Sequence, residues 1–345
     1  MKEKTSSRQL HFGHFKAATS NPLLLMVHYI LAEIPFRTGY TLNRWKEATN
    51  LMILKQEGVY NIDKLRTIVL YEADFNQNNK HFGRELMKHT VPKNRIAKEQ
   101  YSIPGKKCID HALNRRLIFD VNRYQKNSMA MTSCDLKSCY DRVVHTPAVL
   151  AMMGYGAPQE PLTSMFHAIQ NMQYVTRTAF GDSNKTFGGL EDGYTSKPQG
   201  LGQGNGTGPQ VWAAISSKMF EVLHKRNLVS NFNTPISNVN MELSGFAFVD
   251  DSDILAQAGY CNDPIKTVEK MQTTIDCWEG TAKSTGGALA PSKSWWYLIH
   301  FKWDKKGNWK YGDITGLAGE KLTARDMDNN RVELQRLKIS EAKKC

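Results

Sequence analysis

Two adjacent aspartates, Asp250 and Asp251, directly follow the apolar run 245–249. Neighbouring carboxylates repel each other, and burying either one is costly unless a cation compensates. A third aspartate, Asp135, ends a separate apolar run at 131–134. Aspartate is also common in exposed turns, and most isolated Asp-Asp pairs have that role. Because each of these acids stands where an apolar run ends, we predict instead a carboxylate cluster at the ends of two strands.

A carboxylate cluster of this kind suits a hard divalent cation. Mg²⁺ prefers oxygen ligands and is commonly held by a few carboxylates together with substrate phosphates. Two such ions about 3.5–4 Å apart stabilise both the attacking and the leaving oxygen of an in-line phosphoryl transfer. The acids therefore predict a magnesium site for phosphoryl-transfer chemistry.

The surrounding sequence supplies the elements that would position these acids. Residues 129–134 are predicted to form a short buried strand, and 245–257 a strand, an acidic turn and a second strand. The other predicted elements are helices at 141–153, 210–225 and 265–284, an exposed hairpin at 180–193, a glycine-dense loop at 198–209 and a strand at 295–303. In the helix at 265–284, one face carries Val268, Met271, Ile275 and Trp278. This order of elements is α+β.

The glycine-dense loop has glycine at every second position from Gly200 to Gly208. It contains no G-x-G-x-x-G pattern and no following Gly-Lys-Ser/Thr, so it does not predict a phosphate cradle. Glycine at this spacing lets a backbone pass close to something flat, such as a base pair. A merely flexible loop is the alternative.

Composition and charge limit which partners and which compartment can be expected. The chain has 345 residues, with 45 Lys and Arg against 33 Asp and Glu, a net charge of +12. A surplus of this size favours a polyanionic partner. The apolar run 23–35 is interrupted by His28 and Glu33 and is shorter than the roughly 20 residues that a membrane span needs. With Pro22 before it, this run predicts a buried helix.

The termini and the cysteines carry no sign of secretion. Residues 1–8 lack the apolar core of a signal peptide, so we expect an intracellular protein of the nucleus or cytoplasm, with no membrane partner. The six cysteines form no C-x-x-C pair and no zinc spacing, and they indicate a reducing compartment: Cys108, Cys134, Cys139, Cys261, Cys277 and Cys345.

Four short motifs around the acids together resemble the palm of reverse transcriptases. Residues 135–140 resemble the first palm motif, an Asp followed five positions later by an aromatic residue. Pro198-Gln199-Gly200 resembles the second motif, Phe248-Val249-Asp250-Asp251 the third, and Pro291-Ser292-Lys293-Ser294 the fourth. Their order and their spacing of about 60, 50 and 40 residues also fit the family.

Upstream segments extend the resemblance to roughly residues 45–300. Residues 64–68 resemble the Arg-Pro-Ile element of the fingers, with Thr67 in place of Pro, and residues 100–106 are similar to the Gln-x-Gly-Phe-x-Pro-Gly-Arg segment. The closest form is that of non-LTR retrotransposon and group II intron-like retroelement reverse transcriptases of microbial eukaryotes, which share the Pro-Gln-Gly-x-Gly-Gln-Gly-Asn-Gly string at 198–206.

The resemblance implies roles for individual residues. Asp135 and Asp250 would be the ligands of two Mg²⁺ or Mn²⁺ ions, with Asp251 a third acid at the site. Tyr140 would be the steric gate that excludes a ribose 2′-hydroxyl, and Gln199 and Gly200 would line the nascent base pair and the template.

Further implied roles concern the triphosphate and the leaving group. Arg66 would bind triphosphate oxygens, assisted by Lys64. Lys293 is either the general acid that protonates pyrophosphate or a surface lysine. Asp141 and Asp253 are expected to be structural, capping a helix or pairing with Arg. The tryptophans at 295, 296 and 303 favour core packing, although the alternation of Lys and aromatic residues there leaves contact with a nucleic-acid strand open.

The fold that follows is α+β, a right-hand polymerase with fingers and an antiparallel palm sheet packed on helices, its thumb missing or truncated. The expected domains are an N-terminal extension and fingers at 1–125, palm at 126–150 and 196–300, a fingers insertion at 151–195, and a basic C-terminal extension at 301–345.

The implied activity is RNA-directed DNA synthesis from a primer 3′-hydroxyl, using dNTPs, an RNA template and a DNA or RNA primer, in a retroelement. One alternative is a fragment or degenerate copy that only binds nucleic acid. The other is an RNA-dependent RNA polymerase, which Tyr140 and Phe-Val-Asp-Asp disfavour. The sequence leaves the oligomeric state open.

Overall fold

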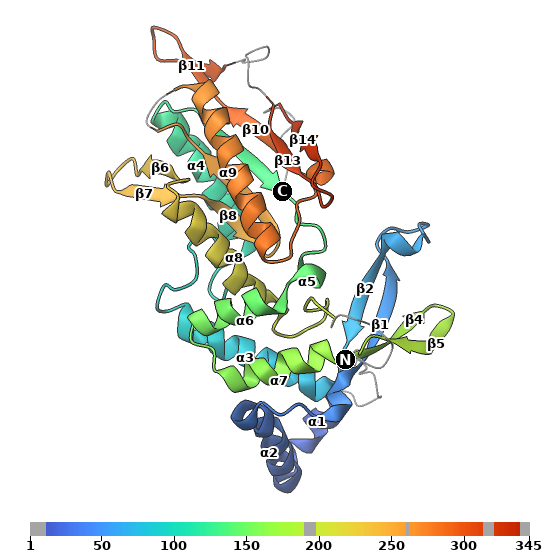
Figure 1. The fold of residues 1–345 in the computed structure, drawn as a ribbon. Coiled ribbons are helices and arrows are strands. Elements are labelled where there is room, and N and C mark those ends of the chain that lie inside the picture. The colour runs from blue at the N-terminus through green and yellow to red at the C-terminus, as the bar shows by residue number, and fades with distance from the viewer. Residues whose placement is uncertain (1–11, 190–197, 260–261, 313–320, 339–345) are drawn as a thin grey trace. The chain divides into compact units, whose positions relative to one another are not determined.

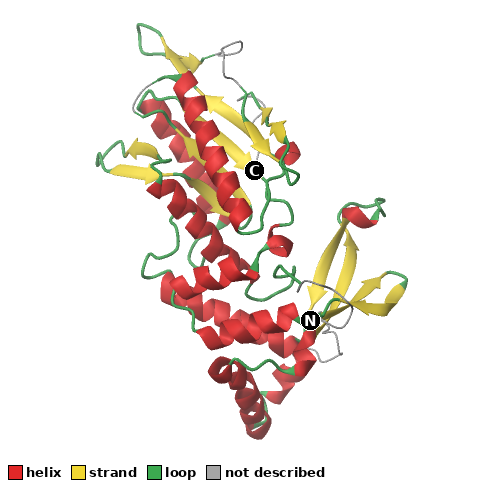
Figure 2. Cartoon of the chain, viewed as in Figure 1, coloured by secondary structure: helices red, strands yellow, loops and turns green. Residues whose placement is uncertain are grey.

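The computed structural model of the chain describes residues 12–189, 198–259, 262–312 and 321–338. The contacts between residues divide the chain into two compact units. The first unit comprises residues up to 90 together with 140–211, and the second comprises 91–139 together with 212 onward. Each unit is considered by itself. Figure 2 shows that both contain helices as well as strands, which confirms the α+β class.

The first unit contains a four-stranded sheet in the order β2-β1-β4-β5. Its strands are β1 (Glu47–Leu54), β2 (Leu65–Leu70), β4 (Gln173–Thr178) and β5 (Gly181–Phe187). The strand β1 is antiparallel to β2 and parallel to β4, while β4 and β5 form a hairpin. The hairpin expected at 180–193 is wrong in position, because its turn lies at 179–180 and only β5 falls in the expected range; residues 190–193 lie outside the described residues.

Helices make up the rest of the first unit. They are α1 (Phe12–Ala18), α2 (Pro22–Thr38), α3 (Ala73–Thr90), α6 (His145–Gly154) and α7 (Gln159–Gln170), with the 3₁₀ turns η1 (Asn43–Lys46) and η2 (Ile62–Lys64). The expected single helix at 141–153 is wrong, because the short helix α5 (Cys139–Arg142) ends at Arg142 and α6 starts anew at His145.

Helix α2 is the apolar helix that the sequence predicts, but it is not buried. The Asn21 side chain accepts hydrogen bonds from the backbone of Leu23 and Leu24, and Gly39 ends the helix with φ +70°. Leu23 and Tyr29 are 74% and 60% exposed, and within α2 only Pro35 is buried among the described residues. The expectation of a buried helix is therefore wrong, since local composition sets the helix but not what covers it.

The second unit is built on a five-stranded sheet in the order β15-β10-β3-β9-β8 (Figure 1). Its strands are β3 (Met129–Cys134), β8 (Gly245–Phe248), β9 (Asp251–Ala256), β10 (Trp295–Ile299) and β15 (Gln335–Arg336). All pairs are antiparallel except β10 with β15. The strand expected at 129–134 and the strand–turn–strand at 245–257 are confirmed.

Two helices pack on this sheet and bury its core. Helix α9 (Pro264–Ser284) packs across β3 and β9, and α4 (Cys108–Tyr124) packs on β8. The four apolar residues predicted on one face of α9 are all buried: Val268, Met271, Ile275 and Trp278. The long helix α8 (Gly208–Lys225) confirms the helix expected at 210–225.

Three small hairpins complete the described part of the second unit: β6 (Ser230–Asn233) with β7 (Asn240–Leu243), β11 (Phe301–Trp303) with β12 (Trp309–Tyr311), and β13 (Thr323–Arg325) with β14 (Arg331–Glu333). The single strand expected at 295–303 is wrong, because His300 separates β10 from β11 and these strands belong to different sheets. Among the described residues, no helix is long and apolar enough to cross a membrane.

Four of the six cysteines lie in the described residues, and no disulfide joins any two of these four. Cys134, Cys139 and Cys277 are buried, whereas Cys108 is exposed. The other two, Cys261 and Cys345, lie outside the described residues.

Candidate active site

The three acids singled out by the sequence meet at one edge of the five-stranded sheet. Strand β3 ends at Cys134, which is the register partner of Ser252 in the antiparallel strand β9. Directly beyond this pair, Asp135 follows the last residue of β3 and Asp251 is the first residue of β9, so both lie at the same edge of the sheet. Asp250 lies beside them, in the turn that joins β8 to β9.

Lys293 reaches the same edge from the neighbouring strand. Strand β10 starts at Trp295, whose register partner is Ser133 of β3. Just before it, the Ser294 hydroxyl accepts a 3.1 Å hydrogen bond from the backbone N–H of Asp135. The Asp135 carbonyl in turn accepts a 2.9 Å bond from the Ala290 N–H. These bonds place the exposed Lys293 beside the Asp135 carboxylate.

Burial and mutual repulsion raise the pKa of all three carboxyls. Burial raises the pKa of Asp135, Lys293 lowers it, and Asp250 raises it again. Burial raises the pKa of Asp250, its own backbone N–H lowers it, and Asp251 raises it. Burial raises the pKa of Asp251, and so do Asp135 and Asp253. Burial is the largest cause of each upward shift, and repulsion between neighbouring carboxylates adds to it.

The turn that carries Asp250 is strained. Val249 has φ +60°, a conformation that is unfavourable for a β-branched residue. Two-residue hairpin turns with a positive φ at the first position normally have glycine there. The Val249 carbonyl accepts a 2.6 Å hydrogen bond from the indole N–H of Trp212 in α8. This bond holds the turn in its strained conformation.

Strand β8 is supported on its outer side by the segment around Gln100. The Ala247 N–H donates to the Glu99 carbonyl and the Ala247 carbonyl accepts from the Tyr101 N–H, both at 2.8 Å. The Gln100 side chain donates a 2.9 Å bond to the Ser216 hydroxyl of α8. The start of the segment 100–106 therefore pairs with β8 like a short additional strand, and it fixes the β8 end of the acidic turn.

Asp253 has the structural role expected from the sequence. Its carboxylate is buried and accepts a 2.7 Å charge-assisted bond from Arg115 of α4. The His111 ring lies 3.9 Å from the same oxygen. Burial with a cationic partner keeps this acid within the fold, two residues behind the exposed Asp251.

The donor set fits hard divalent cations, although the carboxylates do not converge on a point. All three side chains offer oxygen ligands at a single sheet edge, and Mg²⁺ prefers oxygen ligands of this kind. Within the described part of the chain, no three His, Cys, Asp or Glu side chains stand close enough together to hold a metal by themselves. Further ligands, such as substrate phosphates, are therefore needed.

In the first unit, the Gln199-Gly200 pair is tied to α6 by His145. The His145 N–H donates to the Gln199 side-chain oxygen at 3.0 Å, and the His145 Nε2 lies 2.7 Å from the Gly200 carbonyl. The Gln170 amide lies 3.0 Å from His145 Nδ1, so Nε2 carries the proton and donates to Gly200. Burial lowers the pKa of His145, while the Gly200 carbonyl raises it.

Tyr140 lies next to the same loop. Its carbonyl accepts a 2.8 Å bond from the Leu201 N–H, and the Gly200 N–H donates to the Val143 carbonyl at 2.9 Å. A Cβ added to Gly208 would lie 3.4 Å from the Tyr140 ring. The structure thus brings together three of the predicted nucleotide-binding residues, Tyr140, Gln199 and Gly200.

The glycine series approaches the protein itself rather than a free flat surface. Gly200 has φ +86°, and a Cβ there would stand 2.5 Å from the Asp141 carbonyl oxygen. Gly204 has φ +130°, and a Cβ there would collide with the Val69 carbonyl. At these two positions the missing side chain makes room for the chain's own backbone. The expected approach of the loop to a base pair stays a prediction.

Lys64 and Arg66 lie on a neighbouring element of the same unit. Lys64 ends η2 and Arg66 is the second residue of β2, and both side chains are exposed. The Val69 N–H of β2 donates to the Gln203 carbonyl at 2.7 Å, so the glycine-rich loop runs beside the strand that carries Arg66.

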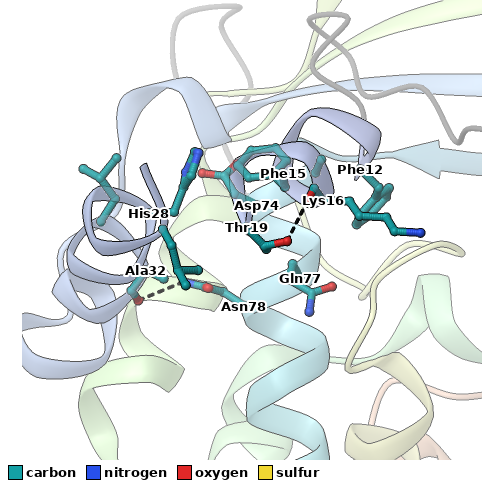
Figure 3. A pocket seen from close by; sticks show the side chains of 12 residues that line it. Phe12, Phe15, Lys16, Thr19, His28, Ala32, Asp74, Gln77 and Asn78 are labelled. Carbon is teal, nitrogen blue, oxygen red and sulfur yellow. Dashed lines mark hydrogen bonds between the residues drawn. The ribbon is translucent and has the colours of Figure 1, made fainter. Parts of the chain in front are cut away.

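The first unit also has a hollow of about 350 Å³ that involves none of these residues (Figure 3). It lies between α1, α2 and α3. Within it the Asn78 amide donates to the Ala32 carbonyl at 3.0 Å, and the Thr19 hydroxyl donates to the Lys16 carbonyl at 2.7 Å. Its lining is mixed: Phe12, Phe15, Lys16, Thr19, Leu25, His28, Leu31, Ala32, Ala73, Asp74, Gln77 and Asn78.

Sequence reasoning missed Trp212, Ser294 and His145, which support these residues through hydrogen bonds. Ser294 belongs to the fourth palm motif, but the resemblance implies no role for it. Trp212 and His145 lie on helices and show no local pattern that differs from core residues. Only the partners that the fold supplies identify them.

Comparison with known proteins places the chain in a family. The family model described as "Reverse transcriptase (RNA-dependent DNA polymerase)" matches residues 53–314, which is more than half of the chain. No protein of curated function matches.

The solved structures to which the chain is similar include telomerases of two Candida species. Apo telomerase from Candida tropicalis, truncated from its C-terminal domain, is 13% identical with a TM-score of 0.48, covering 85% of this chain and 56% of that one. Telomerase from Candida albicans, in complex with a fragment of telomeric RNA, is 11% identical with a TM-score of 0.48, covering 79% of this chain and 44% of that one. The chain spans about half the length of these telomerases. On the match of the family model over residues 53–314, the chain belongs to the reverse transcriptase family.

Proposed function

We propose that the chain is an RNA-directed DNA polymerase that extends a primer 3′-hydroxyl with dNTPs on an RNA template. The observation that carries this proposal is the gathering of Asp135, Asp250, Asp251 and Lys293 at one sheet edge, in a chain of the reverse transcriptase family. We further propose a retroelement as its natural setting.

Asp135 and Asp250 would hold two Mg²⁺ or Mn²⁺ ions, with Asp251 as a third acid. The pKa values of these acids are raised first by burial and then by repulsion between the carboxylates, and a bound cation would offset both effects. When bound, such ions neutralise triphosphate charge and lower the pKa of the attacking hydroxyl. Lys293, beside Asp135, would donate the proton to the departing pyrophosphate.

The residues of the first unit would bind the incoming nucleotide. Tyr140 would exclude the ribose 2′-hydroxyl, and Gln199 and Gly200 would contact the nascent base pair. Their fixed backbone, tied to His145 and Val143, supports a positioning role. The exposed Arg66 guanidinium would bind triphosphate oxygens, with Lys64 beside it.

The domain assignment follows as a proposal. The five-stranded sheet with the acids would belong to the palm, and the four-stranded sheet with Lys64 and Arg66 to the fingers. The boundaries expected from the sequence at 125, 150, 195 and 300 remain predictions.

Primer extension with purified protein, an RNA template, dNTPs and Mg²⁺ tests the proposal. We expect extension by the wild type and none by Asp250→Ala. The matched control is Asp328→Ala, which removes an exposed carboxylate from the turn between β13 and β14 and leaves extension unchanged. Loss of extension in both variants would contradict the assignment of the acidic edge.

The same assay separates the alternative functions. A chain that binds primer–template without extending it is the binding-only remnant. A chain that incorporates NTPs rather than dNTPs is an RNA polymerase. If Tyr140 is the gate, Tyr140→Ala raises NTP incorporation relative to dNTP incorporation; an unchanged ratio would remove that role.

A further inference from the structure

The hairpin of β11 and β12 has two chemically different faces. Its register pairs Phe301 with Tyr311, Lys302 with Lys310, and Trp303 with Trp309. Because side chains alternate along a strand, the aromatic pairs lie on one face of the ribbon and the lysine pair on the other. The two ammonium groups thus come from directly opposite positions on one face.

The positive charge of this hairpin is not compensated within the described part of the chain. Lys302 and Lys310 face each other, and Lys305 and Lys306 lie in the turn; none of the four has an ion pair with a described residue. Like charges directly opposite each other destabilise a strand pair, so the pattern disfavours the isolated hairpin. It is favourable when an anion lies on this surface.

The one acid of the hairpin is already used by the turn. The Asp304 carboxylate accepts bonds from the backbone N–H groups of Lys306 and Asn308, at 2.8 and 2.9 Å, and from the Asn308 side-chain amide at 2.9 Å. These bonds lower the pKa of Asp304. Asp304 therefore shapes the turn instead of neutralising the lysines.

The aromatic face remains partly open and carries further cations. Phe301 is buried, but Trp309 and Tyr311 are 43% and 45% exposed. The Arg123 guanidinium lies 4.6 Å from the Trp309 ring centroid, and the Lys126 ammonium 5.8 Å from that of Trp303. Exposed rings with cations beside them form a surface on which bases can stack while their phosphates are neutralised.

The base of the hairpin is held firmly to the second unit. The His300 carbonyl accepts a 2.8 Å bond from the Gly312 N–H, and the Phe301 carbonyl a 3.1 Å bond from the Asn262 amide. His300 Nδ1 also lies 2.9 Å from the Ser128 hydroxyl. These bonds fix the β11–β12 hairpin before any ligand binds, so the hairpin is a preorganised platform.

This platform lies at the opposite end of the sheet from the acidic edge. Strand β10 leaves that edge at Trp295 and reaches Ile299, one residue before His300 (Figure 1). Five strand residues span about 17 Å. The hairpin is thus a separate surface and not an extension of the candidate active site.

We propose that the β11–β12 hairpin, with Arg123 and Lys126, is a binding site for single-stranded nucleic acid. Bases stack on Trp309 and Tyr311 along the exposed edge of β12, and phosphates contact Lys302 and Lys310. A two-stranded ribbon is only about 5 Å wide, so side chains of both faces reach a strand passing along its edge. The choice of polyanion rests on the proposed function.

Fluorescence anisotropy of the full chain with labelled 12-nucleotide RNA and DNA strands, without divalent cations and over a series of salt concentrations, tests the proposal. In K302Q/K310Q we expect weaker binding and a log–log salt slope shallower by about 1.4, the value for two lost contacts to single-stranded phosphates. In Trp309→Leu we expect binding about tenfold weaker with an unchanged salt slope, since stacking is lost and charge is not.

The matched control is K225Q/K266Q, which removes the same charge from exposed lysines of α8 and α9 in the same unit. It should bind nearly as the wild type does. Equal losses in the two double variants would show a mere effect of net charge, and wild-type binding by K302Q/K310Q would equally overturn the proposal. Removing the opposed lysines should also leave the melting temperature unchanged or raised, which excludes misfolding as the cause.

The outcome is separable from that of the polymerase proposal. Asp250→Ala should bind these strands as the wild type does, because the hairpin needs neither catalysis nor metal. If extension fails but binding is intact and weakened by the hairpin variants, the polymerase proposal is wrong and the hairpin proposal holds. If extension is normal but the hairpin variants bind as the wild type does, the hairpin proposal is wrong and the polymerase proposal holds. Preference between the RNA and DNA arms tells which strand occupies the site.

Discussion

The acidic turn at 248–251 and the glycine-rich loop at 198–208 both contain backbone with positive φ, yet they achieve it by different means. In the loop, the strained positions are glycines, and their missing side chains let the backbone pass against Val69 and Asp141. In the turn, the strained position is Val249, a residue that resists this conformation.

The difference shows two ways of holding an irregular segment in place. The loop is held by close packing, so its stability depends on what is absent at each glycine. The turn is held by hydrogen bonds from outside, above all that from Trp212 to the Val249 carbonyl. A packed segment fails when an atom is added, whereas a strained turn fails when a donor is removed.

The largest effect expected is from adding a methyl group to the loop. Gly204→Ala puts a Cβ against the Val69 carbonyl at φ +130°. We expect it to lower the free energy of unfolding by about 3 kcal/mol, from strain and overpacking together. Urea denaturation followed by circular dichroism measures it.

Gly58→Ala is the control, because Gly58 also has a positive φ, +79°, but nothing lies within 4 Å of its added Cβ. This variant should lower the free energy of unfolding by only about 1 kcal/mol, from the unfavourable backbone conformation alone. Equal losses at the two glycines would mean that close packing does not hold the loop.

The next largest effect should come from removing the donor that holds the turn. Trp212→Phe deletes the indole N–H and leaves the Val249 carbonyl without this partner. We expect a loss of about 1–2 kcal/mol in unfolding free energy, together with slower primer extension, because Asp250 is the next residue. Denaturation and extension rate are measured on the same preparation.

Trp278→Phe serves as the comparison for Trp212→Phe. Trp278 is equally buried, but its indole N–H has no hydrogen-bond partner among the described residues. The same atoms are deleted without a bond being lost, so this variant should be the less destabilised of the two and extend primers normally. A larger loss at Trp278 would count against the role of the Trp212 bond.

A smaller effect is expected from relieving the strain in the turn itself. Val249→Gly removes the unfavourable φ of a β-branched residue but increases the freedom of the unfolded chain. Because these contributions oppose each other, we expect the free energy of unfolding to stay within about 1 kcal/mol of the wild type. A loss of several kcal/mol would show that the Val249 side chain, and not the hydrogen-bonded backbone, holds the turn.

The smallest effect concerns the charge of the turn in the absence of divalent cations. The pKa of Asp250 is raised in the folded chain by burial and by Asp251, although its own backbone N–H lowers it. The native state therefore holds its proton to higher pH than the unfolded state does. Stability falls as the pH rises from the ordinary aspartate value through the raised one. Asp250→Asn removes this loss of stability. The variant should therefore become more stable than the wild type as the pH rises between the two pKa values, and it should remain so at neutral pH.

Thermal melts between pH 3 and 8 with a chelator measure this advantage. Asp304→Asn provides a contrast of opposite sign, since hydrogen bonds lower the pKa of Asp304. The wild type should be more stable than this variant above the lowered pKa, and the difference should disappear as the pH falls through it. Adding Mg²⁺ should stabilise the wild type more than Asp250→Asn. Equal stabilisation of both would contradict metal binding at the turn.

Much of the fold around the acids could be predicted from the sequence because its signals are local. The buried strand at 129–134, the strand–turn–strand around Asp250 and the helix with Val268 to Trp278 on one face all follow from apolar runs or a helical period. Acids at the ends of such strands predict a shared edge, and the register of β3 with β9 places Asp135 and Asp251 there.

Other features were decided only by the tertiary structure, since they join residues that are distant in the chain. The Arg115 partner of Asp253 is 138 residues away, and the Ser294 partner of Asp135 is 159 residues away. The exposure of α2 likewise depends on which surface packs against it, which its apolar composition does not specify. The sequence by itself thus determined which residues are the candidates for the chemistry. Only folding decided which donors hold them, because a hydrogen-bond partner across the fold leaves no pattern in the local sequence.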